Sequence, residues 1–112
     1  MKATLDDFKK LDIRIGEIKK VERVPDTDKL LHLEVDLGEE KYRHIISGIA
    51  EYFEDIKSIV GRQCPFFVNL EPKTIEGFES KGMILAVLDF YNTFLLLESE
   101  KYITYRKRGK VI

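Results

Sequence analysis

Apolar and polar residues alternate in several short segments of this chain, and turn-forming residues separate one segment from the next. Leu11, Ile13 and Ile15 alternate with polar residues, and the same period of two recurs over residues 31–37. Successive side chains of a β-strand point to opposite faces, so each segment would bury one face and expose the other. Gly16 interrupts the first alternation, as a bulge in a strongly curved strand would. We therefore expect a curved sheet.

Three more strands follow from the same kind of pattern. Residues 42–46 come after a Gly-Glu-Glu turn and are expected to pair antiparallel with residues 31–37. The apolar stretches in residues 62–70 and 82–88 predict a fourth and a fifth strand. Pro65 lies within the fourth strand, and a proline there suits an edge or a bulge.

Other segments predict helices and additional strands. Thr4, with Asp7 three residues later, has the form of a helix N-cap, which indicates a short leading helix. Apolar residues recur at helical spacing over residues 50–60, so we expect one helix there. Residues 94–97 and 102–105 are apolar enough to form extra strands near the C-terminus, and such strands often complete an oligomer interface or cap a barrel.

Three strands, a helix and two strands is the order of the OB-fold, a five-stranded Greek-key barrel. The expected fold is therefore an all-β OB-fold barrel with one helix between strands 3 and 4, a short N-terminal helix and extra C-terminal strands. A length of 112 residues suits one domain, covering residues 1–112. Because the face and loops of OB-folds bind oligonucleotides or oligosaccharides, the topology indicates a binding role.

Charge is unevenly distributed along the chain. The net charge is −1, which argues against coating nucleic acid through bulk electrostatics. Residues 1–100 carry 14 basic and 20 acidic side chains, whereas residues 101–112 carry five basic side chains and no acid. The basic tail is read either as a solvated end or as a phosphate contact.

The sequence also indicates where in the cell the protein is located. The longest apolar run is far shorter than the roughly 20 residues that span a bilayer, and residues 1–10 lack a secretory apolar region. We expect a cytoplasmic protein without membrane contact. Cys64 is the only cysteine, and we expect it to pack as a small hydrophobic residue.

No arrangement of residues indicates catalysis. Phosphate-binding glycine motifs and a nucleophile elbow are missing from the sequence, and no cofactor is expected. His32 and His44 lie at outward positions of neighbouring strands and could meet as a cross-strand pair. Two histidines without a third ligand make a poor metal site, so no metal is expected and solvated histidines are the favoured interpretation.

The polar segment 69–83 joins two apolar strands and is the best candidate for ligand contact. Asn69, Lys73, Ser80 and Lys81 could contact phosphate or ribose. The loop between strands four and five is a common ligand site of the OB-fold. Acidic residues balance the basic ones within the segment, so an ordinary polar loop remains the alternative.

At this segment the sequence resembles a known family. Gly61-Arg62, Asn69-Leu70, Pro72-Lys73, Gly77, Ser80 and Gly82-Met83 are similar to the signature of the tRNA-binding domain at the C-terminus of bacterial methionyl-tRNA synthetases. Free-standing structure-specific tRNA-binding proteins, EMAP-II-like domains and CsaA-like chaperones share this domain. Upstream segments resemble the family as well, namely residues 11–16, Pro25 with residues 28–30, residues 35–38 and residues 46–48.

The resemblance implies an OB-fold that holds the outer, elbow side of tRNA by its shape and backbone. Arg14 and the lysines would contact phosphates. Asn69 and Ser80 would hydrogen-bond sugar or phosphate oxygens, and Met83 would pack under the loop. Together, the resemblance, the loop and the tail assign the following residues to tRNA binding: Arg14, Lys29, Asn69, Lys73, Ser80, Lys81, Met83, Arg106, Lys107 and Arg108.

Three functions compete on this reading. The first is a non-catalytic accessory, like a β-subunit, that binds tRNA for an aminoacyl-tRNA synthetase, methionyl by resemblance. The second is a CsaA-like chaperone for unfolded polypeptide, which would need exposed aromatics such as Phe90, Tyr91 and Phe94. The third is a docking subunit that joins synthetases without contacting RNA. The resemblance also implies a homodimer.

Overall fold

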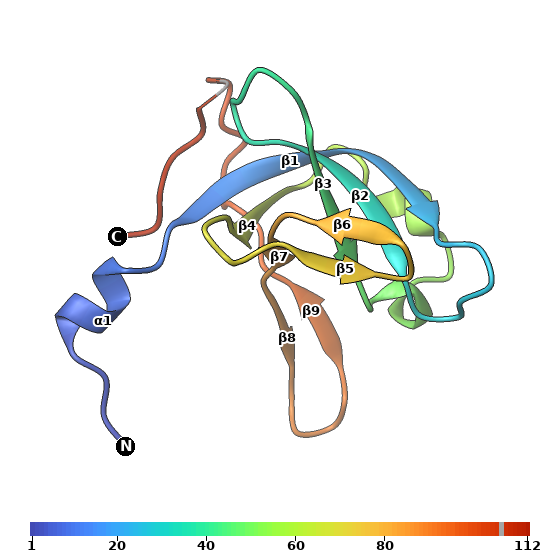
Figure 1. The fold of residues 1–112 in the computed structure, drawn as a ribbon, viewed down its shortest axis with the longest axis horizontal. Helices are drawn as coiled ribbons and strands as arrows, with labels where there is room; N and C mark the ends of the chain where they lie inside the picture. Colours follow the sequence, from blue (N-terminus) through green and yellow to red (C-terminus); the bar gives the residue numbers. More distant parts are fainter. Residues whose placement is uncertain (106) are drawn as a thin grey trace.

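A five-stranded antiparallel sheet forms the centre of the computed structural model, which describes residues 1–105 and 107–112 (Figure 1). The strands follow one another across the sheet in the order β3-β2-β1-β4-β7. Their bounds are β1 (Ile13–Arg23), β2 (Leu31–Asp36), β3 (Arg43–Ser47), β4 (Gln63–Phe67) and β7 (Met83–Ile84).

Hydrogen bonds between the two edges of this sheet curl it into a barrel. The backbone N–H of Lys81, just before β7, donates to the carbonyl of His44 in β3 at 3.0 Å. The guanidinium of Arg43, also in β3, donates to the carbonyl of Val68 at 2.6 Å. Strands at opposite edges therefore meet, and the all-β OB-fold expected from the sequence is confirmed.

The long strand β1 pairs with two neighbouring strands of the barrel, β4 and β2. Residues 13–17 of β1 pair with β4, and residues 17–23 pair with β2. We expected a bulge at Gly16, but the register shifts further along the strand, between Ile18 and Lys20. Gly16 itself pairs regularly with Cys64, and the reason for a glycine there is space, because a Cβ atom would lie 2.6 Å from Cγ1 of Val35.

The core lies inside the curl and is built from the inward residues of the alternating segments. Its fully buried side chains include those of Ile18, Leu31, Leu33, Val35, Ile45, Ile59, Cys64 and Phe66. Burial raises the pKa of the Cys64 thiol to about 12, so this cysteine is a packing residue, as expected.

The short leading helix is confirmed as α1 (Leu5–Lys9). Thr4 and Asp7 form a capping box, in which Oγ1 of Thr4 accepts from the N–H of Asp7 at 3.2 Å and Oδ2 of Asp7 accepts from the N–H of Thr4 at 2.9 Å. No described helix has the length and apolar character that crossing a membrane requires.

The single helix expected over residues 50–60 is instead two short 3-10 helices, η1 (Ala50–Tyr52) and η2 (Ile56–Ile59). Phe53 is extended at φ −125° and ψ 129°, and its ring packs edge-on against Phe94 at 5.4 Å. Oδ1 of Asp55 accepts from the N–H of Lys57 at 3.0 Å. This local hydrogen bond competes with a continuous helix, and the contact of Phe53 with a distant ring favours the break.

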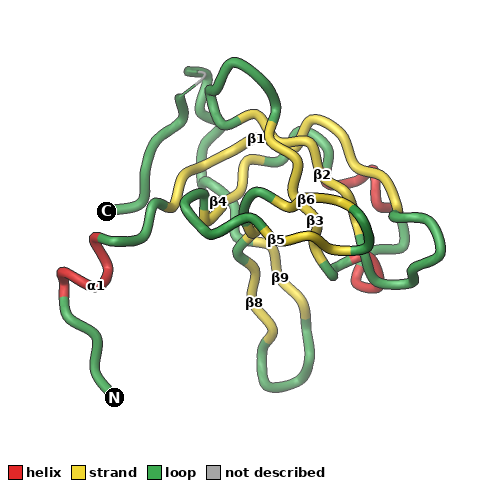
Figure 2. The backbone as a smooth tube through the Cα atoms, viewed as in Figure 1, coloured by secondary structure: helices red, strands yellow, loops and turns green. Residues whose placement is uncertain are grey.

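The polar segment 69–83 contains a hairpin that sequence analysis missed (Figure 2). Its strands are β5 (Lys73–Ile75) and β6 (Phe78–Ser80). Glu76 and Gly77 link them with φ values of 49° and 83°. Two left-handed residues in a two-residue turn match the twist of paired strands, so the Glu-Gly pair between apolar neighbours was the available signal.

The predicted fifth strand, residues 82–88, is divided between two sheets. Its first part is β7, and its second part, β8 (Ala86–Leu88), pairs with β9 (Phe94–Leu96) in a hairpin that projects from the barrel (Figure 1). Strand β9 confirms the extra strand expected over residues 94–97. The strand expected over residues 102–105 does not form, because the N–H of Ile103 donates to the side chain of Gln63 rather than to a neighbouring strand.

Candidate nucleic-acid interface

A groove of about 1380 Å³ runs between the outer face of β2–β3 and the β5–β6 hairpin. Strand β3 contributes Arg43 and His44 to its lining, and the hairpin contributes Phe78, Glu79 and Lys81. The face of strands 2 and 3 together with the loop between strands 4 and 5 is where OB-folds bind oligonucleotides. This groove is therefore the candidate binding site.

Ser80 fixes the hairpin against the barrel. Its buried Oγ accepts from the N–H of Ile46 at 2.9 Å and donates to the carbonyl of Gly82 at 3.2 Å. Gly82 has φ 141°, and a Cβ atom there would lie 2.9 Å from the carbonyl oxygen of Phe67. Ser80 thus sets one wall of the groove from inside, whereas the sequence led us to expect its hydroxyl to face RNA.

Asn69 and Arg14 both form hydrogen bonds with Asp12. The N–H of Asp12 donates to Oδ1 of Asn69 at 2.7 Å, and Nδ2 of Asn69 donates to the carbonyl of Lys10 at 2.8 Å. The guanidinium of Arg14 forms two hydrogen bonds of 2.9 Å with the Asp12 carboxylate, which hold the pKa of Asp12 below its usual value. Asn69 therefore clamps the N-terminal segment, and Arg14 keeps a half-exposed cation at the surface.

The hairpin brings several sequence-predicted residues together. Lys73 and Ser80 are partners in the β5–β6 ladder, and the exposed Lys81 follows directly. Met83 is 44% exposed on β7, so the supporting place under the loop that we expected for it is not observed. Lys29 is exposed but lies in the loop after β1, at the opposite end of that strand from Arg14 (Figure 1).

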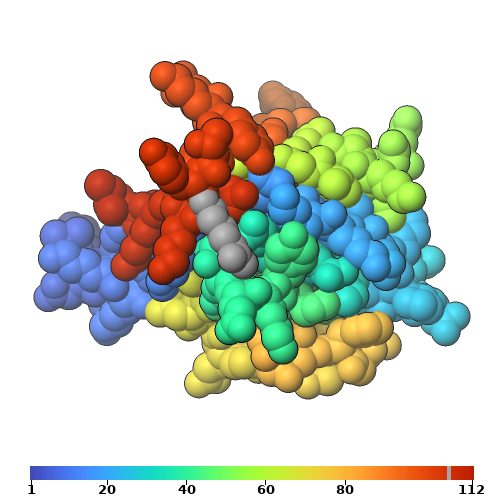
Figure 3. Space-filling view, turned by 90° about the horizontal axis from the view of Figure 1, so that it is seen from above, coloured from blue at the N-terminus to red at the C-terminus, as the bar shows by residue number. Residues whose placement is uncertain are grey.

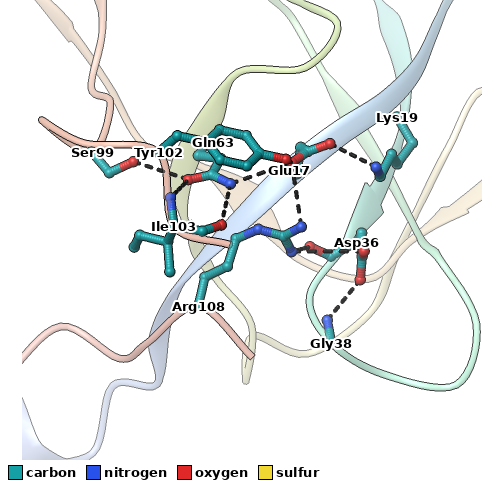
Figure 4. A network of polar contacts seen from close by, with 9 residues as sticks. All are labelled: Glu17, Lys19, Asp36, Gly38, Gln63, Ser99, Tyr102, Ile103 and Arg108. Carbon is teal, nitrogen blue, oxygen red and sulfur yellow. Dashed lines mark hydrogen bonds and ion pairs between the residues drawn. The ribbon is translucent and has the colours of Figure 1, made fainter. Parts of the chain in front are cut away.

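The basic tail divides into a buried and an exposed part. Figure 3 shows the C-terminal segment lying against the body of the molecule. Arg108 is buried, with Nη2 3.3 Å from Oε1 of Glu17 and Nη1 3.7 Å from Oδ2 of Asp36 (Figure 4). The phosphate contact expected of Arg108 is therefore replaced by an internal ion pair. Lys107 is exposed, and Arg106 lies outside the described residues.

Glu17 is the centre of the contacts around Arg108 (Figure 4). Its carboxylate lies 2.6 Å from Nζ of Lys19 and also accepts hydrogen bonds from Tyr102 and Gln63. Burial by itself raises the pKa of Glu17, but the hydrogen bonds from Lys19, Tyr102 and Gln63 outweigh burial and lower the pKa to about 2. This cluster holds the tail on β1.

The two histidines meet, as the strand pattern allowed, and a third ring joins them in the groove. Nε2 of His32 lies 2.7 Å from Nδ1 of His44, and the ring of Phe78 is centred 5.4 Å from that of His32. Sequence analysis missed Phe78, because only the unrecognised hairpin carries it over β2. Within residues 1–105 and 107–112, no three His, Cys, Asp or Glu side chains gather as a metal site would require.

Sequence comparison relates the chain to synthetases over most of its length. Residues 13–106 match the family described as "Putative tRNA binding domain". Methionine–tRNA ligase of Methanococcoides burtonii is 46% identical over 98 residues, which are 88% of this chain and 14% of the ligase. The ligase of Helicobacter pylori strain 26695 is 47% identical over 92 residues, 82% of this chain and 14% of the ligase. The chain thus spans about 14% of these curated relatives.

Solved structures share the whole fold. A MetRS-related protein from Pyrococcus horikoshii superposes with a TM-score of 0.88 at 29% identity, covering 100% of this chain and 99% of that chain. The chaperone CsaA of Bacillus anthracis gives a TM-score of 0.84 at 26% identity and covers 100% of both chains. Each likeness includes the barrel and the segments at both ends.

Proposed function

The chain belongs to the tRNA-binding domain family, and from this membership we propose that it binds folded tRNA through shape and phosphate contacts. The tRNA backbone runs along the groove between β2–β3 and the β5–β6 hairpin. Lys81 meets phosphates in the groove, and Lys73 meets them from the adjoining strand β5, outside the groove lining. Arg14 and Lys107 extend the contact, and Lys29 reaches a separate part of the ligand. The contribution of the chain is binding rather than catalysis.

The observation that carries this proposal is the hairpin that forms one wall of the groove. Ser80 and Gly82 fix its base against β3 and β4, while Lys73 and Lys81 remain exposed. Two cations on a rigid element can contact phosphates with little loss of conformational entropy. Shape-based recognition of RNA depends on such phosphate and 2′-hydroxyl contacts.

The nature of the relatives supports an accessory role. The two ligases described above carry the matched segment as about 14% of a synthetase. We propose that this chain presents tRNA to a methionyl-tRNA synthetase in the cytoplasm. Holding one part of the tRNA raises its effective concentration at the enzyme.

A second function is favoured by one observation, the apolar surface of the β8–β9 hairpin. Leu95 is 51% exposed, and Val87 opposite it and Leu97 beyond it are also exposed. If a homodimer buries this face, the face is not available to unfolded polypeptide, and tRNA binding remains the favoured function. If the face stays open in solution, it suits unfolded polypeptide, in keeping with the structural likeness to CsaA.

Fluorescence anisotropy with folded tRNA, heat-unfolded tRNA and a simple RNA duplex tests the main proposal. We expect the tightest binding to folded tRNA, with an affinity that falls as salt rises. Lys73→Ala should weaken it, whereas Lys57→Ala, an exposed lysine of η2 outside the groove, should have little effect. Equal binding of all three RNAs, unchanged by Lys73→Ala, would instead direct attention to the chaperone or docking role.

A further inference from the structure

Three neighbouring rings, those of His32, His44 and Phe78, line the groove. His32 and His44 share the 2.7 Å contact, and Phe78 leans over His32 from the hairpin with an interplanar angle of 47°. The Phe78 side of this cluster is open, since 38% of that residue is exposed. An exposed ring fixed next to a polar pair differs from a core contact, because its free face can accept a planar ligand.

The histidine pair has a defined proton chemistry. One hydrogen bond between two neutral rings uses one N–H as donor and one bare nitrogen as acceptor, and it leaves a single outward N–H on the pair. One added proton keeps the shared bond and puts a hydrogen on both outward nitrogens. The pair then carries a unit charge and two donors, which suits a phosphate oxygen.

The surroundings of His32 disfavour its charged form in the free protein. Burial lowers the pKa of His32, and His44 lowers it further, while Glu34 and Glu22 act in the opposite direction and Lys20 adds to the lowering. The groove as a whole is lined by four carboxylates and three cations: Glu34, Glu39, Glu40, Glu79, Lys41, Arg43 and Lys81. One of those cations, Arg43, is paired with Glu39 at 2.5 Å. A single proton on the histidines therefore balances the charge of the groove.

We propose that this cluster binds one unpaired nucleotide of RNA, with its base stacked on Phe78 and its phosphate held by the outward N–H groups of the His32–His44 pair. The proposal rests on the tRNA-binding function above and adds a base contact to a surface otherwise suited to the backbone. It also makes binding depend on protons. Since the phosphate favours the charged pair, affinity rises as pH falls from about 8 to about 5.5.

Anisotropy with two short single-stranded RNAs separates base contact from phosphate contact. One RNA carries its bases, and the other has the same number of phosphodiesters but abasic residues. Both lack terminal phosphates and carry a dye that does not titrate, so changes with pH come from the protein. The full chain is measured at about pH 5.5 and about pH 8, together with Phe78→Leu, His44→Gln and, as a matched control, Phe90→Leu in the exposed β8–β9 turn.

We expect the intact RNA to bind at least about fivefold more tightly than the abasic RNA at the lower pH. Phe78→Leu should reduce this ratio to about one, and Phe90→Leu should leave it unchanged. His44→Gln keeps a hydrogen-bonding group beside His32 but removes the pair's proton chemistry, so the rise in affinity at low pH should disappear.

Two outcomes overturn the nucleotide site, namely a ratio near one in the wild type or a ratio unaffected by Phe78→Leu. An affinity that rises equally in His44→Gln overturns the role of the histidine pair. If either occurs while folded tRNA still binds in a Lys73-dependent way, the proposed function stands and only the nucleotide site is wrong. Failure to bind both folded tRNA and the short RNAs overturns both proposals.

Discussion

Arg108 ties the end of the chain to the first two strands of the barrel. Its guanidinium lies against Glu17 of β1 and donates to the carbonyl of Asp36 in β2 at 3.2 Å. Both carboxylates are buried, so each needs a partner to offset the loss of water. A cation at this position is structural, whereas its exposed neighbour Lys107 remains available to a ligand.

Arg108→Ala should therefore lower the free energy of unfolding by about 3 kcal/mol, because it leaves two buried carboxylates short of a partner. Urea unfolding followed by circular dichroism measures the change. Lys107→Ala serves as the control and should shift stability by no more than about 0.5 kcal/mol. Equal stability of the two variants would contradict a structural role for Arg108.

Glu17 gives the fold a specific dependence on pH. Its pKa is about 2 in the folded protein and 4.5 ordinarily, so the unfolded chain takes up the proton first as pH falls. The stabilisation is fully present above about pH 4.5 and is lost between about pH 4.5 and about pH 2, by roughly 3 kcal/mol.

Glu17→Gln should flatten the loss of stability over that acid range, because the side chain no longer titrates. Urea midpoints measured at several pH values test this, with Glu40→Gln at an exposed position as the comparison. An unchanged acid slope in Glu17→Gln, or the same flattening in Glu40→Gln, would show that other groups dominate acid unfolding.

At the scale of elements, Gly16 determines how closely β1 approaches the core. A Cβ atom there would lie 2.6 Å from Val35, 2.8 Å from Leu37 and 3.1 Å from Phe66. Those three side chains lie in the packed interior of the curl. The tight curvature of the barrel thus depends on the missing side chain rather than on an unusual backbone angle.

Gly16→Ala should destabilise the protein by about 1–3 kcal/mol through overpacking. Gly48→Ala is the matched control, because the nearest atom to its new Cβ is 4.0 Å away. Thermal unfolding of both variants is the measurement. A Gly16→Ala protein as stable as Gly48→Ala would mean that the strands can separate without cost.

At the scale of the whole molecule, the β8–β9 hairpin is a separate two-stranded sheet that projects from the barrel (Figure 1). Tyr52 stacks on Phe94, with ring centroids 4.4 Å apart, at the turn end of the β8–β9 ladder. Phe94 and Leu96 turn toward the core, which leaves Val87 and Leu95 on the opposite face. Such an exposed apolar face favours association with a second copy.

Leu95→Glu should therefore convert a dimer into a monomer, since a desolvated charge at the interface is costly. Light scattering coupled to size exclusion gives the mass directly. Leu5→Glu, at an exposed leucine of α1, should leave the mass unchanged. A wild type that is already monomeric would contradict the dimer and leave the hairpin open for another ligand.

Local patterns in the sequence determined most of the barrel. The alternation around Ile13 and Leu33 reports burial on one face, and the capping box of Thr4 and Asp7 closes within four residues. Such signals involve residues close together in the chain, so they can be recognised without knowledge of the fold. The groups that match the family's motif are likewise short segments, which is why family and fold could both be predicted.

Only the tertiary structure determines which polar side chains are exposed and which are held by partners elsewhere in the chain. Arg108 and Glu17 are 91 residues apart, and Asn69 and Asp12 are 57 apart. Ser80 faces inward because β3 offers the N–H of Ile46, and Phe78 reaches His32 only through the hairpin turn. Whether a polar residue finds a partner inside the chain depends on how distant segments close on one another. The sequence supplied the polar groups of the candidate site, and the closure of the barrel determined which of them remain exposed to solvent.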